Sequence, residues 1–161
     1  MRKVLLNPIG MLFAGLLLGA ISRLLDIYTS NLGNIFSQMA VWILLGTLIA
    51  VYSSSPKRAA LNILPFCLGM LAAYYAAAIL IKGVYGRMFI LGWTGFALCS
   101  PVLAFIAWMS KEKGLFPKLI GAGIVLVSVL SSLLLFDGFR VYDVVIDGLL
   151  VYVLFFLNIE R

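Results

Sequence analysis

Charged side chains gather near two predicted helix ends, where they could hold a polar ligand. Arg23 and Asp26 lie three residues apart, so on a helix they share one face. Arg140, Asp143 and Asp147 follow an i, i+3, i+7 spacing and form a second polar stripe. An ionisable group in the middle of a membrane-spanning helix costs about 2.5–3.5 kcal/mol and usually faces a protein interior or a water-filled cavity. The two groups together predict a ligand pocket, to which Gln38 would add a side-chain amide.

The same residues also have a purely structural interpretation. Asp143 lies near the start of its predicted helix, where backbone N–H groups and the helix dipole favour a carboxylate. Asp147 could pair with Arg23 as a strut between two helices. The residues alone leave pocket and strut as alternatives. For the pocket, further polar and aromatic residues would complete the rim: Asn34, Lys82, Tyr85, Arg87 and Trp93.

Long apolar segments must position these groups, and the composition indicates that they lie in a membrane. Of the 161 residues, 64% are hydrophobic and 11% are charged, whereas soluble domains contain about 25% charged residues. A helix needs about 20 apolar residues to cross the hydrocarbon core of a bilayer. We therefore expect one all-α integral membrane domain over residues 1–161, a polytopic bundle of six transmembrane helices. The six segments cover residues 9–25, 35–52, 59–81, 88–109, 115–136 and 141–157.

The basic residues are distributed unequally between the two sides of this bundle. With a cytoplasmic N-terminus, eight of the twelve Lys and Arg residues fall inside and four fall outside. The positive-inside rule therefore places both the N- and the C-terminus in the cytoplasm. Four of the six acidic residues, namely Asp26, Asp137, Asp143 and Asp147, fall at or near the outer side. The predicted ligand pocket is thus an outward-facing one.

Small residues form ladders on two of the predicted helices. Gly15 and Gly19 make a Gly-x-x-x-Gly pattern on the first, and Gly69, Ala73 and Ala77 repeat at i+4 on the third. Such spacing lets helix backbones approach closely. The ladders serve either packing within the bundle or docking of a partner subunit.

Pro101 interrupts the fourth predicted helix. A proline removes the N–H that would bond to the carbonyl of residue i−4, which here is Ala97. Ser100 precedes the proline and can satisfy a freed group. The resulting kink can shape a cavity or only the packing.

The composition also argues against several kinds of chemistry. The chain has no histidine, so a zinc site or a His-based triad lacks its ligand or base. Cys67 and Cys99 stand alone in apolar segments and are expected to be buried free thiols. Asp143 and Asp147 lack the second acidic pair that a magnesium-dependent phosphotransfer site would need. The Lys and Arg residues form no stripe suited to nucleic acid, and we expect no enzyme, cofactor or metal.

The outline of this chain resembles a known family of membrane subunits. Six short-looped helices with polar groups at their outer ends and a small-residue face on the first resemble the substrate-binding S-components of energy-coupling factor transporters. Their Ala-x-x-x-Ala motif is similar to the stretch around Gly15 and Gly19, where glycines replace the two alanines. The resemblance implies capture of a small solute from the outer side, docking on a membrane coupling subunit with separate ATPases, and a bacterial cell membrane. The outline is also similar to that of rod-shape-determining membrane protein D, which implies a non-enzymatic scaffold or regulatory protein instead.

Overall fold

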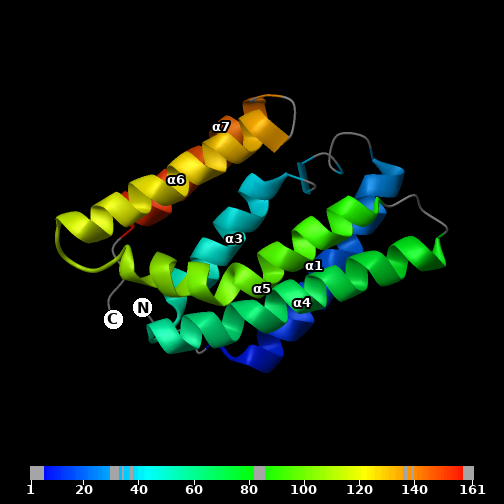
Figure 1. Cartoon of the computed structure of the whole chain (residues 1–161), viewed down its shortest axis with the longest axis horizontal. Helices are drawn as coiled ribbons and strands as arrows, with labels where there is room; N and C mark the ends of the chain where they lie inside the picture. The colour runs from blue at the N-terminus through cyan, green and yellow to red at the C-terminus, as the bar shows by residue number, and fades with distance from the viewer. Residues whose placement is uncertain are drawn as a thin grey trace.

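The chain forms an antiparallel set of helices. A computed structural model describes residues 6–29, 33, 35–36, 38–81, 86–135, 138 and 140–157, without the side chains of residues 87, 89 and 135. Its elements, drawn in Figure 1, are α1 (Pro8–Tyr28), α3 (Met39–Tyr52), α4 (Pro56–Leu80), α5 (Arg87–Met109), α6 (Leu115–Leu135), α7 (Val141–Val151) and the π-helical turn η1 (Tyr152–Phe156). All elements within the described residues are helical, which confirms the predicted all-α class.

Four of these helices are long and apolar enough to cross a membrane. They are α1, α4, the part of α5 from Ile90, and α6 up to Leu134. The other two are shorter, since α3 has 14 residues and α7 has 11 before η1 continues it. The coarse prediction of an all-helical chain with several helices able to span a membrane is therefore confirmed, and the count of six spans stays a prediction.

The predicted boundaries hold within a few residues, with one larger difference. α1 continues to Tyr28, three residues beyond the predicted end. The second span was predicted from residue 35, but α3 begins at Met39 because the backbone of Gln38 is extended, with φ −76° and ψ 139°. The last helix ends at Phe156, and Leu157 is extended. The predicted end of the fifth span, residue 136, lies outside the described residues.

Local capping explains where two helices begin. Pro8 is the first residue of α1, and the Asn7 side chain accepts a hydrogen bond from the backbone N–H of Gly10 at 2.6 Å. Pro56 opens α4 in the same way, behind Ser55, whose hydroxyl accepts from the N–H of Arg58 at 3.2 Å. The helices then alternate in direction, so the α3–α4 and α5–α6 turns lie at one end of the molecule (Figure 1).

The closest backbone approach is between α1 and α4. A Cβ atom at Gly15 would overlap the carbonyl oxygen of Phe66, and one at Gly19 would overlap that of Met70. From the other side, a Cβ at Gly69 would come within 2.7 Å of the Leu12 carbonyl oxygen. Gly15, Gly19 and Gly69 therefore pack α1 on α4, which is the first of the two predicted uses of the ladders, and docking of a partner stays a prediction.

The helix α3 lies between two groups of helices. It contacts α4 and α5 on one side and α6 and α7 on the other, and Figure 1 shows α6 and α7 on the opposite side of α3 from α1. Trp42 and Ala50 of α3 are buried with Ile63 and Phe66 of α4 and with small residues of α5 such as Ala104. Apolar burial of this kind holds α3, α4 and α5 together.

Adding one methyl group at Gly15 should test the contact between α1 and α4. Gly15→Ala must push the two backbones apart, so it should lower the free energy of unfolding by about 3 kcal/mol. Gly92→Ala is the matched control, because a Cβ there meets nothing within 4 Å. Reversible unfolding of the purified protein in mixed micelles measures both. Equal stability of the two variants would contradict the packing described here.

Candidate functional site

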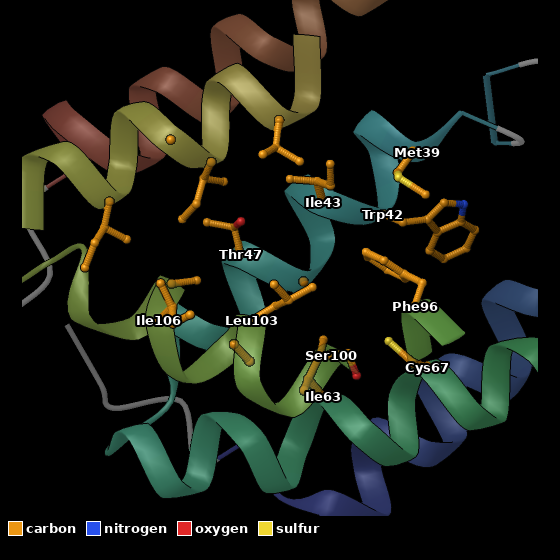
Figure 2. Close-up of a pocket in the computed structure, with 17 residues that line it drawn as sticks. Met39, Trp42, Ile43, Thr47, Ile63, Cys67, Phe96, Ser100, Leu103 and Ile106 are labelled. Carbon is orange, nitrogen blue, oxygen red and sulfur yellow. The ribbon is translucent and has the colours of Figure 1, made fainter. Parts of the chain in front are cut away.

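An apolar cavity of about 500 Å³ lies between α3, α5 and α6, with α4 at its base. Figure 2 shows Thr47 and Ile43 of α3 facing Leu103 and Ile106 of α5 across it, with α6 along the far side. Ile63 and Cys67 reach it from α4. Its volume falls in the range of about 300–1,000 Å³ that is usual for small-molecule sites.

The cavity opens sideways between α5 and α6. Three lining residues at this opening are exposed to solvent or lipid, with exposed fractions of 46% for Leu103, 39% for Ile106 and 57% for Val127. All three are apolar and lie within helices that can span a membrane. The opening therefore lies along the apolar length of two helices that are able to span a membrane.

Two hydroxyl groups interrupt the apolar lining. Ser100 donates its hydroxyl to the carbonyl oxygen of Ala97 at 2.7 Å, which confirms that it satisfies the group freed by Pro101. Thr47 is buried, and its hydroxyl points into the cavity in Figure 2. The indole N–H of Trp42 is donated to the Phe36 carbonyl at 2.8 Å, so at the cavity this residue contributes its apolar ring.

The first predicted polar group forms a closed cluster between α1 and α4. Arg23 is buried, and its guanidinium lies 2.7 Å from the carboxylate of Asp26 and 3.2 Å from the hydroxyl of Tyr74. Tyr74 also donates to Asp26 at 3.1 Å, and the guanidinium lies 5.3 Å from the centre of its ring. This geometry ties the C-terminal end of α1 to α4.

The second predicted group lies on the other side of the molecule, between α6 and α7. Asp143 is buried and caps its own helix, since its carboxylate accepts the backbone N–H of Arg140 at 2.9 Å. Asp147 is also buried and accepts the hydroxyl of Ser128 on α6 at 2.6 Å. The Arg140 side chain donates to the Tyr142 hydroxyl at 2.6 Å.

The structure separates the residues that the sequence grouped in one pocket. The predicted strut between Arg23 and Asp147 is wrong, because Arg23 bonds within the α1–α4 cluster and Asp147 bonds to α6. Gln38 is buried at the start of α3. A ligand-binding role for these residues stays a prediction. Of the predicted rim, Asn34, Lys82, Tyr85 and the side chain of Arg87 lie outside the described residues, whereas Trp93 packs against the core.

The two cysteines differ in burial. Cys67 is buried, but Cys99 is exposed because α5 turns its neighbour Ser100 toward the cavity. Ala73 and Ala77, the other two residues of the predicted ladder on α4, are half-buried.

The cavity itself was missed by sequence reasoning, since its lining is ordinary apolar sequence. The signals available were Thr47 inside an apolar helix and the Ser100–Pro101 pair.

A comparison of the chain with protein-family models, with curated proteins and with solved structures found no match.

A double-mutant cycle should show that the two polar groups are independent. Arg23→Ala and Asp147→Ala each remove a buried polar contact, and their effects on the free energy of unfolding should add to within about 0.5 kcal/mol. Arg23→Ala and Tyr74→Phe share contacts and should instead couple by about 0.5–3 kcal/mol. Unfolding in mixed micelles measures all of these variants. Coupling above about 1 kcal/mol between Arg23 and Asp147 would show that they do interact.

Proposed function

We propose that this chain is an integral membrane protein that binds a hydrophobic or weakly amphipathic small molecule, which enters from the bilayer between α5 and α6. The observation that carries this proposal is the cavity of about 500 Å³ with its exposed apolar opening at Leu103, Ile106 and Val127. The proposal keeps small-molecule binding as the predicted function and replaces the polar ligand by an apolar one.

The chemistry of the cavity supports this ligand class. Liquid water occupies about 30 Å³ per molecule, so the cavity volume corresponds to roughly 17 waters. Each buried water needs two to four polar partners, and the hydroxyls at the cavity are those of Thr47 and Ser100. Hydrocarbon therefore fills this space more favourably than water. A ligand with one polar group would place that group at Thr47.

The proposal extends to orientation and energy supply. We place both termini in the cytoplasm of a cell that is bacterial, with the protein in its cell membrane. The Lys57–Arg58 and Lys111–Glu112 turns then lie on the cytoplasmic side, as the positive-inside rule favours. Ligand uptake would draw its energy from a separate membrane coupling subunit with ATPases.

Filling the cavity should abolish ligand binding. Gly123 on α6 lines the cavity, and a Cβ there meets nothing within 4 Å, so Gly123→Leu occupies binding space without a backbone clash. Ala122→Leu on the same helix is the matched control, because Ala122 is exposed and lies outside the lining. We expect native mass spectrometry to find a bound apolar molecule on the parent protein and on Ala122→Leu, and at least tenfold less on Gly123→Leu.

The outcome separates binding from general effects on the fold. Equal ligand occupancy of the two leucine variants, at equal thermal stability, would contradict the proposal. So would a parent protein that carries no apolar molecule when it is extracted with lipid and supplied with a mixture of fatty acids and isoprenoid alcohols.

A second candidate is a scaffold that docks partner helices, and one observation favours it. Ala72 and Ala76 on α4 and Gly92 and Gly95 on the neighbouring α5 are exposed. A Cβ at either glycine meets nothing within 4 Å. Exposed small residues let a second helix approach closely in a membrane.

Bulk at Gly95 should separate the two candidates. If the protein is a scaffold, Gly95→Leu should prevent its association with a partner. If it binds an apolar ligand in the cavity, Gly95→Leu should leave that binding unchanged. Cross-linking in native membranes, compared between Gly95→Leu and the Ala122→Leu control, measures association. A cross-linked partner lost in Gly95→Leu alone would favour the scaffold.

A further inference from the structure

Four buried oxygen-bearing side chains lie on the neighbouring helices α6 and α7, two on each helix. Ser128 and Asp147 are in contact through their hydrogen bond of 2.6 Å. Ser132 lies one turn further along α6, and Asp143 lies one turn back along α7. Because neighbouring antiparallel helices keep their register over one turn, Ser132 is level with Asp143. We call Ser128, Ser132, Asp143 and Asp147 the α6–α7 oxygen cluster.

Three oxygens of this cluster lack a hydrogen-bond partner within the part of the chain that the structure describes. They are Oγ of Ser132, Oδ1 of Asp143 and Oδ2 of Asp147, and each atom is fully buried. The residues themselves are 1%, 0% and 6% exposed. A buried polar atom without a partner costs about 1–3 kcal/mol, and more when it is charged. The cluster therefore presents oxygens that a ligand can satisfy.

The two carboxylates differ in how their charge is compensated. Asp143 accepts the Arg140 backbone N–H at the N-terminus of α7, where the helix dipole is positive. Asp147 lies one turn deeper, and its hydrogen bond comes from the neutral Ser128 hydroxyl. Buried charges in proteins are paired or bind metal ions, and acidic residues within membrane spans often mark ion pathways. The dipole of α7 offsets about half of the Asp143 charge, so Asp147 is the less compensated carboxylate and calls for a positive charge beside it.

We propose that the α6–α7 oxygen cluster binds a single Na⁺ ion. Carboxylate and hydroxyl oxygens are ligands for hard cations. Calcium takes six to eight oxygens, and the described residues contain no group of three His, Cys, Asp or Glu side chains suited to a metal ion. The 2.6 Å hydrogen bond across the seam also keeps the helices close, which favours a small ion. The site is independent of any ligand in the cavity.

Thermal unfolding in matched salts tests this site directly. The purified full chain in nanodiscs is unfolded in NaCl and in choline chloride at equal ionic strength and constant pH. We expect Na⁺ to raise Tm by about 5–10 °C when its concentration reaches one hundred times its Kd. Direct binding of radioactive Na⁺ should saturate at one ion per chain.

Substitutions in the cluster provide the controls. Asp147→Asn should abolish the dependence of Tm on Na⁺, and Ser132→Ala should weaken Na⁺ binding about tenfold through the loss of one ligand. Ser131→Ala is the matched control, because the Ser131 hydroxyl is donated to the Ser128 carbonyl at 2.7 Å. It should leave Na⁺ binding unchanged.

The proposal is overturned if the parent protein has the same Tm in both salts and binds no radioactive Na⁺. It is also overturned if Tm changes with pH but not with Na⁺, since the cluster then takes up a proton. If Asp147→Asn does not fold, the parent protein and the Ser132→Ala and Ser131→Ala pair still decide between these results. Failure here leaves the cavity proposal untouched, because these measurements involve no apolar ligand.

Discussion

The position of α3 is the constraint on which the remaining architecture depends. This helix of 14 residues contacts α4 and α5 on one side and α6 and α7 on the other. It presents Gly46 and Thr47 toward the space between α5 and α6, and these small residues cannot fill that space. The cavity thus follows from packing two groups of helices around one short helix.

The helix α6 separates two different environments. Val127 lines the apolar cavity, whereas the next residue, Ser128, bonds to Asp147 of α7. Successive helical residues point about 100° apart, so a polar seam and an apolar cavity can share one helix. The helix α6 therefore contributes residues to both sites, each on its own face. The Arg23–Asp26–Tyr74 cluster lies with α1 and α4, away from both.

The sequence predicted the local features of this structure better than its contacts. The predicted span starts at residues 9 and 59 lie within three residues of Pro8 and Pro56, where the two helices begin, because capping acts within a few residues. The Ser100–Ala97 hydrogen bond follows from Pro101 alone. Arg23 and Asp147 could not be assigned partners, because helix packing order is not a local property. The cavity was not predicted for the same reason, since its apolar lining comes from four helices that look alike in sequence.

Photolabelling by an apolar probe most directly tests whether this cavity accepts hydrocarbon from the bilayer. A diazirine-bearing fatty acid is added to the protein in nanodiscs, activated by light, and its attachment sites are mapped by peptide mass spectrometry. Labels should concentrate on cavity residues such as Trp42, Thr47 and Leu103, and an excess of unlabelled fatty acid should displace them. Labels spread evenly over exposed apolar residues outside the cavity, such as Leu61 and Leu134, would contradict the proposed binding site.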